Sequence, residues 1–412
     1  MATVLYLQQA AAVSIAPSVT RYMQLAANSR YSDDTTTEAA AQITYRSGGV
    51  FSNLYINILT NTITATSTFR TRNNGANAAM VVSITASTTG KFEDTSNTDT
   101  VTAGDEWNYI FTTGATGTAI TFRIISCLFA ATTNTVTRLG RDNASAADLG
   151  TSATTPGPIC GDGTFVLSGT ESNYALYFRT AGTLANMFID ISANGRSTTS
   201  TLVSRINGAT GNLSIAITAA ATGLFEDTAN SDSVALDNYV NLAFVSGTGT
   251  GTMTVDSIAT DFTTTNGNFM FHAVAQSGQV VNAGVTTYYP LAGALRTSTT
   301  ESEMQAEANL IMATSLMQVN LTANTVVESS LFRLRKNTAN GNQVVTCTGL
   351  TTGVFQDTTN SDSLVATDIV DYSLVTGATG TSLTVRSVSL LADSTVAGGS
   401  TWVGYQSPFG WN

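Results

Sequence analysis

The sequence repeats one block three times in a single register. Around Phe92 the chain reads TTGKFEDTSNTDTV, around Phe225 it reads ATGLFEDTANSDSV, and around Phe355 it reads TTGVFQDTTNSDSL. The three phenylalanines stand 133 and 130 residues apart, and the same two spacings superimpose many other residues. The matching sets include Glu38, Glu171 and Glu301; Arg72, Arg205 and Arg335; and Asn74, Asn207 and Asn337. A period of this length is the size of a domain, so we expect three tandem copies of one unit.

Within each copy the apolar residues alternate with polar ones, as at Leu54, Ile56 and Ile58. The same alternation occurs at Met187, Ile189 and Ile191 and at Met317, Val319 and Leu321. A period of two places one face of a strand on a core, and turn signals such as NNGAN separate the runs. The pattern therefore predicts an all-β protein of three tandem antiparallel β-sandwich domains, jelly-roll-like, with seven or eight strands each.

The copies differ in length only in their lead-in segments, where surface loops absorb such changes. We place the domains at residues 1–130, 131–262 and 263–393, followed by a C-terminal tail at 394–412. Two arrangements remain open, a linear array of beads or a compact pseudo-trimer around a common axis. About 40 residues join each ungapped block to the next, and they contain strand-like runs such as FMFHAVA.

Composition excludes several classes of function. Only 11% of residues are charged, the formal net charge is −11, and there are just two lysines, Lys91 and Lys336. Nucleic-acid binding needs several cations on one face, and anionic membranes attract basic segments, so we expect neither partner. No apolar run reaches the length of a transmembrane helix, and the N-terminus lacks the pattern of a secretory signal peptide.

Three cysteines are present, Cys127, Cys160 and Cys347, without metal-ligand spacing. A disulfide between Cys127 and Cys160 is conceivable, but reduced, half-buried thiols fit the odd number better. His272 is the only histidine and has no counterpart in the other copies, so a Ser-His-Asp arrangement would occur at most once. With no zinc ligand set and few tryptophans, the sequence favours a protein that is not an enzyme.

One recurrent acidic motif could bind calcium. The motif D-T-x-N-x-D supplies oxygen atoms at close spacing, which suits a cation that takes six to eight oxygen ligands. Its residues are Asp94, Asn97 and Asp99; Asp227, Asn230 and Asp232; and Asp357, Asn360 and Asp362. The alternative is a strand-to-strand loop whose Asp, Asn and Thr side chains bond to the local backbone. No other cofactor is indicated.

A second recurrent motif, Arg-x-Asn, begins at Arg72 and closes a strand that runs into a Gly/Asn turn. Because Glu38 and Asp94 also recur in every copy, we expect this arginine to form a structural ion pair or a forked hydrogen bond. A ligand role, for example towards a sugar acid, is the alternative.

Several of these motifs together resemble virion proteins of tailed bacteriophages. They are the opening MATVLYLQ, the lead-in YYPLAG, a T-E-A start, and G-x-F-x-D-T-x-N-x-D-x-V. In related C1q/TNF-like heads a strand ending R-x-N-G precedes a V-x-x-G-D strand; VTAGDEWNY keeps this pattern, whereas VALDNYVNL and LVATDIVDY keep it in part.

The resemblance implies a non-enzymatic structural protein on the exterior of a virion, such as a capsid decoration, a fibre or a tail appendage. Its partners would be other virion proteins, copies of itself and a host surface glycan, and it would assemble in the host cytoplasm. The alternatives are a microbial cell-surface fibre or adhesin and an array of carbohydrate-binding β-modules, either of which would act outside the cell.

Overall fold

The computed structural model is all-β, with 3-10 turns as its only helical elements in the described part of the chain. It describes residues 2–23, 25, 36–133, 135–141, 146–148, 150–157, 159, 161–162, 170–264, 268–308, 311–393 and 401–406. The 3-10 turns are η1 (Glu38–Ala41), η2 (Glu171–Asn173) and η3 (Glu301–Glu303). Each opens on the recurrent glutamate at the start of a sequence block. The expected fold class is confirmed.

Copy 1 is a sandwich of two sheets. Its first sheet contains β1 (Ala2–Ile15), β4 (Gly49–Asn61), β7 (Gly90–Asp94), β8 (Asp99–Val101), β10 (Ile120–Ala131) and β32 (Thr401–Gln406). Its second sheet contains β2 (Thr20–Met23), β3 (Ile43–Thr44), β5 (Ser67–Asn73), β6 (Ala76–Ile84) and β9 (Glu106–Thr112).

Copy 2 repeats this plan. Its first sheet contains β11 (Thr135–Arg141), β12 (Ala146–Asp148), β14 (Gly161–Asp162), β16 (Gly182–Asn194), β19 (Gly223–Val234) and β21 (Thr252–Thr264). Its second sheet contains β13 (Thr154–Gly157), β15 (Leu176–Tyr177), β17 (Ser200–Ile206), β18 (Ala209–Ile217) and β20 (Tyr239–Ser246).

Copy 3 repeats it again. Its first sheet contains β22 (Phe269–Asn282), β24 (Gly293–Ala294), β26 (Met312–Val326), β29 (Gly353–Leu364) and β31 (Gly380–Asp393). Its second sheet contains β23 (Thr286–Tyr289), β25 (Ala306–Glu307), β27 (Ser330–Lys336), β28 (Ala339–Cys347) and β30 (Ile369–Val375).

Each copy has the strand order of a jelly roll. When the eight main strands of a copy are numbered along the chain, one sheet has the order 1-8-3-6 and the other 2-7-4-5. Neighbours in both orders pair antiparallel, as β10 does with β1 and with β4. We call the 1-8-3-6 sheet the inner sheet and the 2-7-4-5 sheet the outer sheet of each copy.

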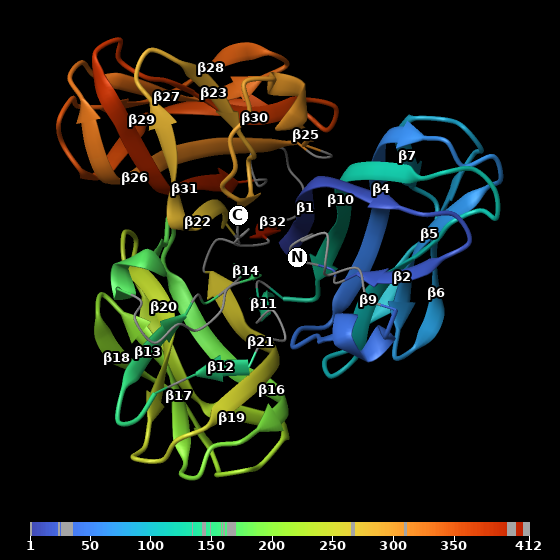
Figure 1. The fold of residues 1–412 in the computed structure, drawn as a ribbon, viewed down its shortest axis with the longest axis vertical. Coiled ribbons are helices and arrows are strands. Elements are labelled where there is room, and N and C mark those ends of the chain that lie inside the picture. The colour runs from blue at the N-terminus through green and yellow to red at the C-terminus, as the bar shows by residue number, and fades with distance from the viewer. Residues whose placement is uncertain are drawn as a thin grey trace.

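The three copies form a compact ring and do not hang as beads (Figure 1). The inner sheets turn towards a common centre, where the ends of β1 and β32 also lie, and the outer sheets lie on the periphery. Of the two arrangements that the sequence left open, the structure therefore shows the pseudo-trimer.

The central strand of each inner sheet shows why the ring closes. On β10 the residues Ile124–Phe129 are all buried, as are Ser257–Phe262 on β21 and Val385–Ala392 on β31. Alternate side chains of a strand point to opposite faces, so unbroken burial means that both faces of the sheet are covered. One face packs on the core of its own sandwich, and the other packs at the centre of the ring.

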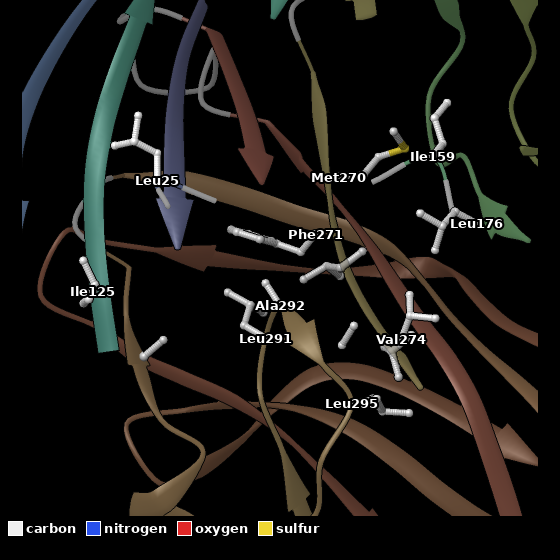
Figure 2. Packing of buried hydrophobic residues seen from close by; sticks show 14 of the residues in the cluster. Leu25, Ile125, Ile159, Leu176, Met270, Phe271, Val274, Leu291, Ala292 and Leu295 are labelled. Carbon is white, nitrogen blue, oxygen red and sulfur yellow. The ribbon is translucent and has the colours of Figure 1, made fainter. Parts of the chain in front are cut away.

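Apolar side chains from all three copies meet at this centre, which we call the hub (Figure 2). Leu25 and Ile125 come from copy 1, and Ile159 and Leu176 come from copy 2. Between them lie residues of copy 3, Phe271 among them. The cores of the sandwiches and the hub form one continuous apolar cluster.

The C-terminal strand β32 lies in the segment that we assigned to a tail. It pairs in parallel with the N-terminal strand β1, from Ala2 opposite Thr401 to Leu7 opposite Gln406. In copies 2 and 3 the same edge of the first strand is covered by a two-residue parallel strand of the same copy, β14 or β24. The first and the last described strands therefore meet in one sheet beside the hub.

Candidate functional site

The recurrent arginine forms the expected fork with the recurrent glutamate in every copy. Arg205 donates from Nε and Nη2 to the two carboxylate oxygens of Glu171, at 2.9 Å each. Arg335 and Glu301 repeat the geometry at 2.9 and 3.1 Å, and Arg72 and Glu38 form the same pair. The fork ties the 3-10 turn of each copy to the fourth strand. The expected structural ion pair is confirmed, with the glutamate as its carboxylate.

The acidic motif lies along one edge of each sandwich. Strand 5 of the outer sheet (β6, β18 or β28) pairs only with strand 4, so the N–H groups on its other side have no partner strand. In copy 3, Asp357 accepts from the backbone N–H of Val344 at 2.8 Å. Asp362 accepts from the N–H groups of Asn342 and Gln343 at 2.7 and 3.0 Å.

Copies 1 and 2 repeat these contacts with the corresponding residues. Asp94 and Asp227 each accept from one N–H of strand 5 at 2.8 Å, and Asp99 and Asp232 each accept from two. The amides of Asn97, Asn230 and Asn360 donate back to the first aspartate of their own copy. The carboxylates thus replace a neighbouring strand and cover an edge that would otherwise be open to another sheet.

These hydrogen bonds account for the acidity of the first aspartate. Burial by itself raises the pKa of Asp357, but hydrogen bonds from Asn360 and from three backbone N–H groups outweigh it and lower the pKa to about 2. The pKa values of Asp94 and Asp227 are lowered from the same balance of causes. Within the described residues, no three His, Cys, Asp or Glu side chains are grouped to hold a metal ion. Calcium binding by this motif stays a prediction, whereas the local backbone bonds are observed.

Two of the cysteines and the histidine are buried. Cys127 and Cys347 are free thiols in the core, and burial raises the pKa of each to about 12. Cys160 lies outside the described residues. His272 is 1% exposed, with Nδ1 2.9 Å from Ser389 Oγ and its ring beside Phe178 of copy 2. It therefore lies at a contact between copies 2 and 3.

Side chains that sequence comparison did not single out join one copy to the next. Between copies 1 and 2, Arg46 Nη2 lies 2.9 Å from Glu226 Oε2, and the guanidinium covers the ring of Phe188 at 5.3 Å. Ser47 donates to Asp261 at 2.9 Å, where both groups are buried.

The joint between copies 2 and 3 uses the equivalent positions. Arg179 corresponds to Arg46, and its side chain is fully buried. It donates to Gln356, which corresponds to Glu226, at 3.2 Å and to the carbonyl of Leu316 at 2.8 Å. Its carboxylate partner, Asp237, belongs to its own copy.

The joint between copies 3 and 1 has a different chemistry. Here Lys91 Nζ of copy 1 lies 2.5 Å from Glu307 Oε1 of copy 3 and 3.4 Å from Glu93. Burial tends to lower the pKa of Lys91, but the bond to Glu307 and the charges of both glutamates raise it overall. The joints run in one sense around the ring, from copy 1 to 2, from 2 to 3 and from 3 to 1.

One carboxyl is buried without a hydrogen bond from any described residue. Asp371 is fully buried and corresponds to Asn108 and Asn241, whose amides donate to the next backbone carbonyl. Burial, followed by the charge of Glu301, raises the pKa of Asp371 to about 8, although Arg335 opposes the shift. The side chain is inaccessible to a substrate, and in its neutral form it stands in for the amide of the other copies.

An open polar groove of about 590 Å³ lies beside β28 and β29 of copy 3. Amides, hydroxyls and one lysine surround it: Lys336, Asn337, Asn340, Asn342, Ser361 and Ser363. Lys336 is bonded to Asp368, and the carboxylate of Asp362 also lines the groove. The floor is Gly341, where a Cβ atom would stand 2.8 Å from Asp362 Oδ2.

No protein-family model matches this sequence, and no curated protein matches it significantly. In the part of the chain that the structure describes, no helix is long and apolar enough to cross a membrane.

Replacing Asp357 with alanine should destabilise the protein by about 2 kcal/mol at pH 7, because the N–H groups that it accepts from lose a charged acceptor. Its pKa is about 2 in the folded chain and about 3.9 in an unfolded one. The contribution is therefore complete above about pH 4 and is lost as the pH falls towards 2. Urea unfolding of the wild type and Asp357→Ala at pH 7, 4 and 2.5 measures this. Glu106→Ala removes an exposed carboxylate as the control, and an equal loss in both variants would contradict the role of the edge contacts.

Replacing Asp371 with asparagine should remove a pH dependence of stability. The folded chain keeps a proton on Asp371 up to about pH 8, whereas the unfolded chain loses it near pH 4. The wild type should therefore lose stability as the pH rises from 4 to 8, and Asp371→Asn should not. Melting temperatures between pH 5 and 9 test this. The matched variant Asn241→Asp should introduce the same pH dependence into copy 2, and identical slopes in all three proteins would disprove the assignment.

Proposed function

We propose that this protein is a non-enzymatic structural component of a tailed-bacteriophage virion, on the particle exterior as a capsid decoration, a fibre or a tail appendage. The observation that carries the proposal is the ring of three jelly rolls closed around one apolar hub. This is the arrangement of a trimer, made within a single chain. It fits an element that contributes a rigid body to a larger assembly.

The resemblance to virion proteins and C1q/TNF-like heads supports the same role, since jelly rolls of that kind usually trimerise. Fusion of three copies fixes their stoichiometry and lets the three outer sheets differ in sequence. A virion ring of this kind would present three related but distinct peripheral faces to its partners. Assembly in the host cytoplasm is compatible with the free thiols of Cys127 and Cys347.

The use of the recurrent polar groups supports a structural role over a chemical one. The glutamate–arginine fork holds a 3-10 turn, and the acidic motif covers a sheet edge. Residues that recur at fixed positions in all three copies are thus bonded within their own copy. The polar contacts at the joints, in contrast, use residues that differ between copies.

Mass spectrometry of purified particles, with heads and tails separated, tests the proposal. We expect the chain in the particle fraction at a fixed copy number, and the separation assigns it to head or tail. A protein found only in the free soluble fraction of infected cells would contradict a virion role.

Binding of a host surface glycan is a second candidate function, which the polar groove of copy 3 favours. Neutral amides and hydroxyls can hydrogen-bond to a polyhydroxylated ligand. The same chemistry would suit an adhesin or a carbohydrate-binding module outside the cell. A glycan array should show binding that Ser363→Trp, which fills the groove, abolishes and that Ser233→Trp, at the equivalent exposed position of copy 2, does not. Equal binding by both variants would exclude the groove.

A further inference from the structure

We propose that the joint between copies 3 and 1 is the one seam at which the ring opens, and that its reversed charge arrangement restricts it to closing on itself. The seam is defined by Lys91 and Glu93 of copy 1 and Glu307 of copy 3. The inference concerns the ring alone and does not depend on a virion role.

The chain itself holds the other two joints together. Strand β10 ends at Ala131 and β11 begins at Thr135, while β21 ends at Thr264 and β22 begins at Phe269. Links of this length span only about 10–20 Å, so the copies they join stay at a high effective concentration. No comparable link joins β31 to β1, because they lie at opposite ends of the chain. The seam can therefore open without moving the other two joints.

The charges at the seam have the opposite polarity to those at the first joint. From copy 1 to copy 2 the preceding copy supplies the cation, Arg46, and the following copy supplies the anion, Glu226. From copy 3 to copy 1 the preceding copy supplies the anion, Glu307, and the following copy supplies the cation, Lys91. At the second joint the preceding copy again supplies the cation, Arg179, which meets the neutral Gln356.

This polarity disfavours wrong pairings. If copy 3 docked on copy 2 in place of copy 1, Glu307 would face Leu224, which corresponds to Lys91. Glu226 lies two residues further along the same strand, so the pairing would offer Glu307 no cation and a nearby anion. The edge of copy 1 set against Arg46 or Arg179 would bring Lys91 near a second cation, with Glu93 at the position of Glu226 facing the same arginine. Like charges at close range repel, and partial burial reduces the screening by water and salt. The two surfaces that an open seam exposes, one on copy 1 and one on copy 3, thus fit each other better than they fit the surfaces of the other joints. They would fit the same two surfaces of a second chain equally well.

Strand β32 makes a second connection between copies 3 and 1, at the edge of the copy 1 inner sheet opposite β7. It lies in the tail that follows copy 3, contacts β22 and β31 of copy 3 and β11 of copy 2, and pairs in parallel with β1 of copy 1. Among the described strands it is the only one that extends the inner sheet of a different copy. Copies 3 and 1 are therefore joined by a pairing of backbone strands as well as by an ion pair, and no such strand pairing joins the other copies in the described part of the chain.

Carbodiimide cross-linking of the full chain tests the order of opening, since the chain contains only two lysines. This zero-length reagent should link Lys91 to Glu307 across the seam and Lys336 to Asp368 within copy 3, pairs that lie 2.5 and 2.9 Å apart. In urea below the global unfolding transition, we expect the first product to fall several-fold while the second persists. If the two products decline together, the seam does not open first and the proposal is wrong.

Charge reversal tests the polarity independently. Lys91→Glu places two glutamates against Glu307, so its radius of gyration in solution should exceed the value of about 22 Å expected for a compact chain of this length. The double variant Lys91→Glu/Glu307→Lys should restore the compact value, and Arg46→Glu, at a joint bridged by the chain, should leave it unchanged. A compact Lys91→Glu, or a double variant as expanded as the single one, would overturn the proposal.

If Lys91→Glu fails to fold, as judged by circular dichroism, the neutral variant Lys91→Met replaces it. Its seam should show faster hydrogen exchange in β7 and β25 than in the wild type, with β19 and β16 unaffected. Unchanged exchange at β7 and β25 would equally contradict the seam.

Discussion

Strand 8 of every inner sheet is covered on both faces, and the rest of the molecule depends on that double burial. A jelly roll that stood alone would expose one face of Ile124–Phe129 in copy 1, and the equivalent face in the other copies. Full burial of a Leu, Ile or Phe side chain contributes about 1.5–3 kcal/mol, so leaving three such faces in water would be strongly unfavourable. Meeting at one hub removes all three faces from water together, and strands β1 and β32 lie at the centre of the ring.

Once the hub fixes the ring, polar contacts decide which edges meet. At the equivalent positions the joints carry Arg46 with Glu226 and then Arg179 with Gln356. The third joint carries Lys91 with Glu307 instead. A true homotrimer has three identical joints, whereas a fused chain is free to vary each one. Here the variation gives each joint its own chemistry. The specificity of each copy for its proper neighbour then arises from wrong pairings that repel as well as from correct pairings that attract.

The edges of the outer sheets do not meet another copy, and side chains of the same copy cover them instead. The outer sheets end on strand 5, where unpaired N–H groups would invite pairing with another molecule. The aspartates of the acidic motif accept hydrogen bonds from these groups within the same sandwich. This explains why a run that resembles a calcium-binding motif recurs without the ligand spacing of one. These contacts leave fewer free N–H groups on strand 5 with which another sheet could pair.

The sequence by itself determined the number of copies, the strand pattern and the contacts made within one copy. The fork of Arg72 with Glu38 and the loop role of Asp94 were predictable because the three copies share them, and shared residues stand out when copies are compared. Ring closure was decided only by the tertiary structure. The joint residues differ between copies, and their partners lie 180 residues away for Arg46 and 216 for Lys91, at distances where periodicity carries no information. Asp371 was likewise hidden, since its proton depends on burial, and burial is a property of the packed sandwich and not of the residue.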